Sequence, residues 1–508
     1  MNKTKNKIRY AALFLICALM FALVSCAAGS DKNVQRTGGG NASKSEADEV
    51  ESVKIERPNI PEGTNYGGAE FRALVPDAAV TRIGDEIYAE EESGDVLNDA
   101  VYTRNRLVED MLNIKITTVM GQGHWLADLP KQVRNVVQAG DDVYDIMDGV
   151  YQPPLAFEGL LINLYKVPNM DLSKPWWDQR MIEDLSYRKS QLYYIIGDIG
   201  YFGMSGVMCT LFNKQLFSDN GFDFPYDKVR EGAWTLDEYS KLIRAAALDL
   251  NGDGKMDETD QWGSYGNSGT VLWSMLGCGE NVVALDQDGV PFINSLSDRH
   301  VQVVTALGTL TSDKNVFLLA ENIKSSSDPY DLLGIATKNG HFLFFSSTLA
   351  QIQGQRALEY DFGVIPYPKF DENQPEYRSP ATSYSSGASS ISIPVTNSNT
   401  ERTGMILEAL SGYSTDIIIP ALIDVALKSK YTRDEDSAEM VEIILRTKFF
   451  DRLMEYGWGS ISWGGLYWNV YSQLTLKGAD TFVSAVEKQM SKADADTEKF
   501  ISTFDELN

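Results

Sequence analysis

The sequence has 508 residues, of which 43 % are hydrophobic and 23 % are charged, and its formal net charge is −26. A chain of this length can bury more than one sizeable core. Its acidity disfavours nucleic acid and anionic lipid surfaces as partners, because both carry the same sign of charge. With four cysteines there is no disulfide framework, and Cys209 and Cys278 are expected to be buried thiols, with a single bridge as the alternative.

Residues 1–25 have the layout of a secretory signal, with four basic side chains ahead of the apolar run "AALFLICALMFALV". The run is too short to span a membrane as a helix. It ends in "LVSC", which resembles the bacterial lipobox, so we expect Cys26 to carry a lipid anchor; a chance cysteine after an ordinary signal is the alternative. Residues 26–65 are rich in Gly, Ser, Asn and charge, and predict a flexible tether. The mature protein is expected on the extracytoplasmic face of the cell membrane, attached through this anchor only.

The body then alternates between strand and helix patterns. Strands are predicted at 69–75, 114–119 and 144–150, with helices at 96–112 and 125–140 between them. This alternation predicts parallel sheets. Further on, "WTLDEYSKLIRAAALDL" predicts a helix whose Thr235 and Glu238 have capping-box spacing. Strands at 361–370 and 388–396 and amphipathic helices at 401–413 and 437–457 complete the pattern.

The stretch "DLNGDGKMDETD", from Asp249 to Asp260, has the spacing of an EF-hand calcium loop. Its ligand positions hold Asp249, Asn251, Asp253, Lys255 (through its carbonyl), Asp257 and Asp260, and Gly254 occupies the sixth position, where the chain must turn. Asp260 is one methylene shorter than the usual bidentate Glu, which predicts weaker or water-assisted coordination. We expect a structural Ca²⁺ site; the alternative is an acidic turn whose Asn and Asp side chains bond to their own backbone.

Five stretches of the body occur in an order that resembles a known family. They are "DDVYDIMDGV", the pair "YYIIGDIGYFG" and "LFNKQLFSDNGF", "WTLDEYSKLIRAA" leading into "LNGDGKMDETDQWG", "YDFGVIPYPKFDENQPEY", and "SISIPVTNSNTERTGMILEAL". The family is that of the extracellular solute-binding lipoproteins of bacterial carbohydrate ABC importers (family 1-like solute-binding proteins), and the resemblance covers nearly all of residues 66–508.

The resemblance implies an α/β, two-lobed periplasmic-binding-protein-like fold, in which each lobe is a mostly parallel sheet flanked by helices and hinge strands join the two lobes. Lobe one would comprise 66–197 and 363–395, and lobe two would comprise 198–362 and 396–508. The implied function is capture of a carbohydrate, expected to be an oligosaccharide, in the cleft between the lobes. A monomer would then deliver it to the membrane subunits of an ABC permease.

Sugars have apolar ring faces and many hydroxyl groups, so aromatic side chains with Asp and Ser partners are expected to line such a cleft. In lobe one the candidates are Asp148, Tyr151, Tyr384 and, at the rim, Trp177. In lobe two they are Trp273, Ser346, Ser347, Trp463, Tyr467 and Trp468. Each aromatic residue could instead belong to the core, and Asp148 could instead cap a helix.

Three other functions remain open. A secreted carbohydrate-active enzyme would need only two carboxylates. However, the sequence contains no Walker loop, no G-x-S-x-G and no C-x-x-C, and its three His residues are scattered, so we expect no catalytic activity. A binding protein that feeds a sensor kinase would have the same cleft. A peptide or another polar solute could also take the place of the sugar.

Overall fold

The computed structural model describes residues 56–77, 83–124, 127–204, 206–323, 340–353, 360–382, 390–428, 435–456 and 465–507. The chain divides into two compact units, Met1–Pro58 and Asn59–Asn508. The predicted signal and Cys26 lie outside the described residues, as does the predicted tether up to residue 55. Everything below concerns the second unit.

The first sheet has the strand order β12-β3-β1-β2. Strand β1 runs parallel to β2 and β3, and only β12 is antiparallel, so this sheet is mostly parallel, as predicted. Phe71, Ala73 and Leu74 of β1 are fully buried on both faces, as is typical of a strand inside a helix-covered parallel sheet. The strands are β1 Ala69–Val75, β2 Ile114–Met120, β3 Ile146–Asp148 and β12 Ile391–Ser392.

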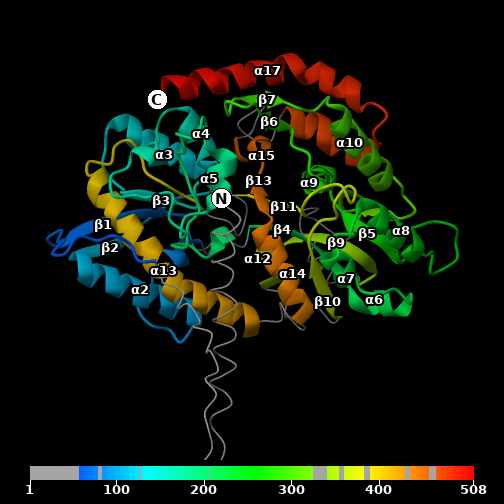
Figure 1. The fold of residues 1–508 in the computed structure, drawn as a ribbon, viewed down its shortest axis with the longest axis horizontal. Helices are drawn as coiled ribbons and strands as arrows, with labels where there is room; N and C mark the ends of the chain where they lie inside the picture. The colour runs from blue at the N-terminus through cyan, green and yellow to red at the C-terminus, as the bar shows by residue number, and fades with distance from the viewer. Residues whose placement is uncertain are drawn as a thin grey trace, which may run out of the picture. The chain divides into compact units, whose positions relative to one another are not determined.

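Helices around the first sheet complete what we call lobe one (Figure 1). The sequence determines the ends of α2: the Asp95 side chain accepts hydrogen bonds from the N–H groups of Leu97 and Asn98, and Asn113 ends the helix with a left-handed φ of 49°. The helical segments are η1 Ile83–Glu86, α2 Val96–Leu112, α3 Asp128–Ala139, α4 Pro153–Phe157, η2 Leu164–Lys166, α5 Gln179–Leu185, η3 Phe202–Met204 and α13 Thr400–Lys428.

The second sheet, with order β10-β4-β9-β5-β8, is the centre of lobe two. It is mixed: β5 runs parallel to β8 and β9, but β4 is antiparallel to both β9 and β10. Its strands are β4 Met208–Asn213, β5 Trp262–Gly266, β8 Phe317–Leu319, β9 Phe342–Thr348 and β10 Phe362–Ile365. Its helical segments are α6 Lys214–Asp219, α7 Tyr226–Arg230, α8 Leu236–Ala246, α9 Thr270–Gly277, α10 Asp298–Thr311, η4 Ala320–Asn322, α12 Leu349–Gln353, α14 Glu435–Arg446, η6 Tyr467–Tyr471 and α16 Ser472–Lys477.

Two small two-stranded sheets and two helices remain. Strands β11 Ser379–Ala381 and β13 Lys448–Phe450 pair in parallel, and β6 Val283–Leu285 and β7 Pro291–Ile293 form an antiparallel hairpin. The helices are α15 Arg452–Tyr456 and the long C-terminal α17 Phe482–Glu506. The predicted helix over 437–457 is therefore wrong in its middle, because Phe449 and Phe450 pair with β11 instead of continuing the helix.

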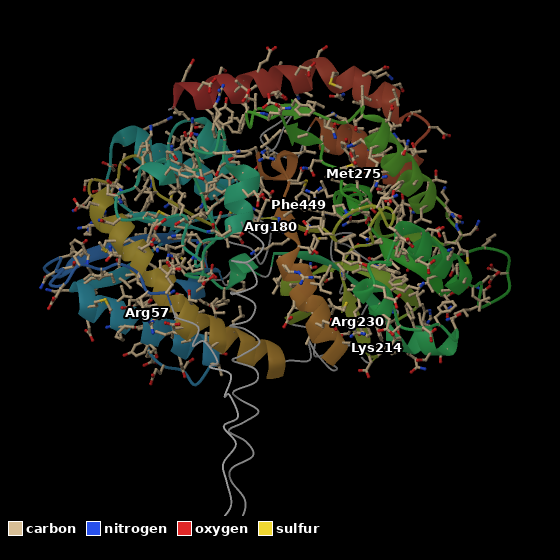
Figure 2. All side chains as sticks on the ribbon, viewed as in Figure 1. Arg57, Arg180, Lys214, Arg230, Met275 and Phe449 are labelled. Atoms are coloured by element: carbon tan, nitrogen blue, oxygen red, sulfur yellow. The ribbon has the colours of Figure 1, made fainter. Side chains whose placement is uncertain are left out.

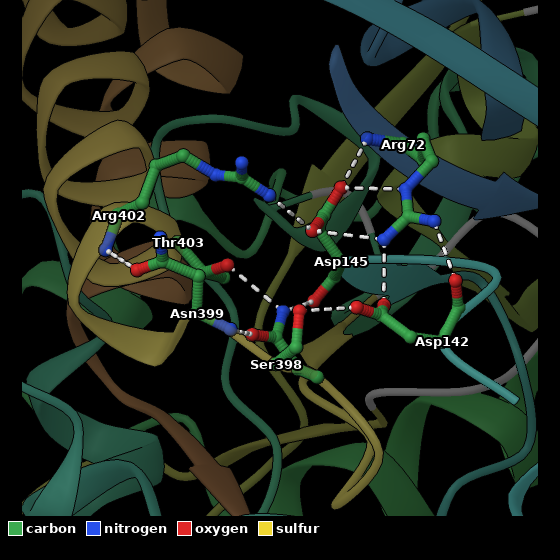
Figure 3. A network of polar contacts seen from close by, with 8 residues as sticks. Arg72, Asp142, Asp145, Ser398, Asn399, Arg402 and Thr403 are labelled. Atoms are coloured by element: carbon green, nitrogen blue, oxygen red, sulfur yellow. Dashed lines mark hydrogen bonds and ion pairs between the residues drawn. The ribbon is translucent and has the colours of Figure 1, made fainter. Parts of the chain in front are cut away.

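The structure places several segments in the other lobe from the one predicted. Residues 198–204 were assigned to lobe two, but η3 belongs to lobe one, where the Phe202 N–H donates to Glu86 Oε2 of η1 at 2.7 Å. Strand β10, assigned to lobe one from residue 363, pairs with β4 of the second sheet. The segment after 396, assigned to lobe two, is held in lobe one by a polar network (Figure 3). There Arg402 Nη2 lies 3.1 Å from Asp145 Oδ1, and Arg72 of β1 pairs with the same carboxylate at 3.0 Å. Helix α13 continues from this network and packs on α2.

The predicted tether also ends earlier than expected. Ile60 already packs against the core, and Asn65 Oδ1 accepts hydrogen bonds from the backbone N–H of Gly67 and from Asn113 Nδ2. These contacts make residues 60–65 part of lobe one rather than a solvated linker.

One described helix, α13, is long and apolar enough to cross a membrane over Thr400–Leu422, by length and composition only. Of that window 56 % is buried inside the structure, where the helix packs on α2. Core helices pass the same test, so this is weak grounds for a membrane span.

Candidate functional site

The strand pair β11–β13 is where segments of the two lobes meet, and we call it the junction. On the lobe-two side, Ala381 of β11 forms a β-bridge with Val207, directly before β4. On the lobe-one side, the N–H of Phe450 in β13 donates to Asp184 Oδ2 of α5 at 2.9 Å. Lys448 also pairs with Asp178, whose side chain caps the start of α5.

Charged side chains of both signs surround the junction. Burial raises the pKa of Asp184 and of Asp451 to about 6, and it lowers the pKa of the neighbouring Arg378 and Arg452. The mixture keeps each buried charge close to an opposite one. The junction is therefore a polar environment inside an otherwise apolar core.

Arg378 also packs on a buried aromatic ring of the junction. Its guanidinium carbon lies 3.7 Å from the ring centroid of Phe449, and its Nη1 donates to Asn281 Oδ1 at 2.9 Å. Nearby, the partly exposed Arg180 of α5 lies 3.7 Å from the exposed Glu376. Figure 2 labels Arg180 and Phe449, which come from α5 and β13, two elements in contact. We did not predict these residues, because they come from four separate segments and form no local motif.

The structure places the lobe-one candidates Asp148 and Tyr151 in the interior. Asp148 ends β3 opposite Ile391, and Tyr151 follows shortly after the strand has ended; their exposed fractions are 1 % and 2 %. Asp148 is not the cap of α4, since that position is held by Gln152. Burial raises the pKa of the Tyr151 hydroxyl. Their role in binding stays a prediction.

The assignment of Trp177 to the rim is wrong. Its side chain is fully buried, and its indole N–H donates to Glu408 Oε2 of α13 at 3.1 Å. Gly197 is a glycine at the point of contact: a Cβ there would lie 2.7 Å from the Trp177 ring. Trp177 therefore belongs to the core of lobe one.

In lobe two, Trp273 keeps an exposed part while Val271, Leu272 and Met275 around it on α9 are fully buried. Ser346 and Ser347 are buried in β9, opposite Thr210 and Cys209 of β4. Consecutive strand residues point to opposite faces, so at most one of these two serines can face a ligand.

The structure does not describe the side chains of the four remaining candidates. Tyr384 and Trp463 lie outside the described residues, and for Tyr467 and Trp468 only the backbone, in η6, is described. As predicted, Cys209 and Cys278 are free and buried, and burial raises the pKa of both thiols.

The acidic loop after α8 folds through its own side chains. Asp249 accepts hydrogen bonds from the N–H groups of Gly252 and Gly254, and both glycines have left-handed φ angles, 71° and 80°. Fully buried Asp260 accepts from the N–H groups of Leu250 and Asp257. Among the described residues, no three His, Cys, Asp or Glu side chains converge so as to hold a metal ion. The carboxylates of Asp249 and Asp260 thus bond to backbone N–H groups of the loop, and binding of Ca²⁺ there stays a prediction.

A chain of polar contacts in lobe two superficially resembles catalytic machinery. His300 Nε2 lies 2.7 Å from the Tyr471 hydroxyl, which donates to Ser295 Oγ, and His300 Nδ1 lies 3.6 Å from Glu280 Oε2. His300, Tyr471 and Ser295 are all fully buried, and the His300 ring stacks on Phe482. A substrate cannot reach them, so this network braces α10 against η6 and α17.

An open groove of about 650 Å³ lies on lobe one, and none of the predicted site residues lines it. Its lining is polar and includes Arg106, Glu109 and Lys115, at the end of α2 and the start of β2. Ligands of open α/β sheets bind at the carboxyl ends of the strands, and this groove lies at the opposite end of β2.

Comparison with solved structures identifies the fold class. An ABC substrate-binding protein from Listeria monocytogenes, in complex with cycloalternan, matches at 14 % identity with a TM-score of 0.53, over 85 % of this chain and 99 % of that one. A sugar transporter from Rhizobium etli in an open conformation matches at 11 % identity and TM-score 0.56, over 84 % and 100 %. UgpB from Mycobacterium tuberculosis, in complex with glycerophosphocholine, matches at 11 % identity and TM-score 0.52, over 84 % and 99 %.

These similarities show that the chain has the two-lobed, periplasmic-binding-protein-like fold that the sequence predicts. At such low identities they establish the fold alone. No protein-family model matches the sequence, and no curated protein matches it either.

Proposed function

We propose that this protein is the substrate-binding component of an ABC importer and holds a carbohydrate, in particular an oligosaccharide, between its two lobes. The observation that carries the proposal is the fold, which matches an ABC substrate-binding protein and a sugar transporter over nearly their whole length. A two-lobed protein can close around a small ligand and release it without changing it chemically. On this proposal the protein is a carrier and not an enzyme.

The junction supports a polar ligand. It brings charged groups and the Asn281 amide together where segments of the two lobes meet, and Trp273 of α9 keeps an exposed part. Sugars need both hydrogen-bonding groups and flat apolar surfaces; the junction would supply hydrogen-bonding groups, and Trp273 would supply an apolar surface. The predicted residues Tyr384, Trp463, Tyr467 and Trp468 would add further aromatic surfaces.

A second ligand class is favoured by one comparison. UgpB has the same fold with similar agreement, and its complex contains glycerophosphocholine, which is not a sugar. A small phosphodiester would need cationic partners, and Arg180 at the junction is the partly exposed candidate. The screen described below therefore includes this compound.

The proposal also includes an anchor and an ion. Cys26 would carry a lipid that holds the protein on the extracytoplasmic face, within reach of the permease. The loop would bind Ca²⁺ through the side chains of Asp249, Asn251, Asp253, Asp257 and Asp260 and through the Lys255 carbonyl. To do so, its carboxylates would release the backbone N–H groups and coordinate the ion instead. The ion would stiffen lobe two and would not contact the ligand.

A thermal-shift screen tests the proposed function. The mature chain with Cys26→Ser is mixed with a panel of oligosaccharides, glycerophosphocholine and short peptides, and its melting temperature is measured. A ligand that binds only the folded state stabilises it by mass action and so raises the melting temperature. At a ligand concentration of 100 times Kd the gain in stability is about 2.7 kcal/mol. Stabilisation by an oligosaccharide supports the proposal, and stabilisation by glycerophosphocholine alone supports the second ligand class. A panel without any effect contradicts both.

A further inference from the structure

The C-terminal helix α17 contacts both lobes (Figure 1). Its 25 residues span about 37 Å at 1.5 Å per residue. The buried side chains recur every three or four residues, or two turns apart, and therefore form one stripe along the helix. They are Phe482, Val486, Ala493, Thr497, Phe500 and Phe504.

The first turns of α17 are fixed to lobe two. The ring of Phe482 stacks on His300 of α10 at 6.1 Å and lies 5.8 Å from the ring of Tyr471. Helix α17 also packs on β7 and η6. Because Phe482 is 2 % exposed and Val486 is fully buried, this end is a core contact.

The last turns of α17 are fixed to lobe one. Phe500 and Phe504 stack on each other at 4.2 Å, and both meet the ring of Phe157 in α4 edge-on, at 5.4 and 5.6 Å. Tyr187, after α5, and Tyr456 of α15 complete the cluster at 5.1 to 5.8 Å. Since α15 follows directly on β13, this cluster also adjoins the junction.

An ion pair closes the lobe-one end. Asp505 accepts a hydrogen bond from the Tyr187 hydroxyl at 2.9 Å and pairs with Arg188 Nη2 at 3.1 Å. Arg188 sits in a turn with a left-handed φ of 45°, and the tip of the β6–β7 hairpin approaches it: a Cβ added at Gly289 would lie 3.6 Å from the Arg188 Cα. The β6–β7 hairpin thus touches the same turn that holds the end of α17.

We propose that α17 is a strap that limits how far the lobes separate in the absence of ligand. A helix cannot stretch, and both of its ends are buried in opposite lobes, so the lobes can rotate about α17 but cannot move apart along it. Loosening the lobe-one end would widen the ligand-free ensemble. It would also weaken ligand affinity, because the apparent Kd rises as the competent fraction falls. Only this affinity effect rests on the proposed function.

The test compares Asp505→Asn with Asp494→Asn in the mature chain. Both variants remove one carboxylate from α17, but Asp494 lies on the exposed face. We expect Asp505→Asn to speed amide exchange of residues 497–507, to increase the radius of gyration measured by small-angle X-ray scattering without ligand, and to weaken binding roughly two- to five-fold, as for an exposed ion pair. Asp494→Asn should change none of these.

Faster exchange in Asp505→Asn with an unchanged radius of gyration would overturn the strap, and so would unchanged exchange. Phe504→Ala should give the same changes with a larger amplitude if it folds; Asp505→Asn alone decides the question if it does not. The exchange and scattering measurements need no ligand. A chain that widens as expected but binds no compound of the panel would refute the proposed function and leave the strap supported.

Discussion

Glu408→Gln should remove a pH-dependent loss of stability from lobe one. Burial raises the pKa of Glu408 to about 7, from 4.5, although its Oε2 accepts hydrogen bonds from the Trp177 indole and the Asp171 N–H, which favour the charged form. The folded state therefore holds this proton more tightly than the unfolded state does. Below about pH 4.5 both states are protonated and nothing is lost; as the pH rises through 7, stability is lost progressively.

The amount of stability that is lost follows from the shift in the pKa of Glu408. At about 1.4 kcal/mol per pKa unit, a shift from 4.5 to about 7 corresponds to about 3.5 kcal/mol of stability lost well above pH 7. The glutamine side chain of the variant cannot ionise, while its amide oxygen can still accept the indole hydrogen bond. The free energy of unfolding of the variant, relative to the original chain, should thus rise by about 2.5 kcal/mol between pH 5 and pH 8, since part of the loss already occurs below pH 5.

Urea unfolding of both proteins at a series of pH values measures this difference. Asp184 and Asp451, whose pKa values are also raised, titrate in both proteins and cancel in the comparison. Glu401→Gln, at an exposed position of the same helix, is the matched control and should follow the original chain. Parallel curves for Glu408→Gln and the original chain would refute the burial argument, and with it the placement of Trp177 in the core.

Four further predictions concern the anchor, the loop and the ligand. Cys26→Ser should leave the protein unprocessed or release it from membranes, and unaltered membrane retention would refute the anchor. Asp253→Ala should lower the melting temperature in calcium but not in chelator, with ligand affinity unchanged; a chelator that abolishes binding without destabilising the fold would instead place the loop in the site. Asp260→Ala should cost about 1–3 kcal/mol even without calcium, because the Leu250 and Asp257 N–H groups lose the buried carboxylate that accepts from them, and a smaller effect in urea unfolding would show that the loop is not held by this side chain. Trp273→Ala should weaken binding roughly five- to a hundred-fold with little loss of stability, whereas a loss of about 3–5 kcal/mol would make it a core residue.

The sequence predicts well those parts of the fold that depend on local patterns. Helix α2 begins after Asp95 and ends at Asn113 because both caps are encoded next to the apolar stripe, and Thr235 caps α8 as its spacing predicts. The alternating apolar pattern likewise locates β1 to the residue. These elements depend on neighbours a few positions away.

Contacts between distant segments could not be predicted in this way. The sequence of Lys448–Phe450 continues a helical pattern. These residues nevertheless form a strand, because their backbone pairs with β11, which lies nearly 70 positions earlier. Trp177 resembles a ligand residue until Glu408, 231 positions later, is seen to accept its N–H. Arg378 and Phe449 come into contact only after the strands have paired. Exposure of an aromatic side chain is a property of the whole packing, and the site was therefore predicted less well than the fold.

The central claim, that this protein carries an unmodified oligosaccharide, is tested most directly by calorimetric titration with the oligosaccharides that raise its melting temperature, followed by analysis of the recovered sugar. We expect saturable binding of one sugar per chain and complete recovery of that sugar unchanged. No binding of any oligosaccharide, or cleavage products that increase with protein concentration, would contradict the account.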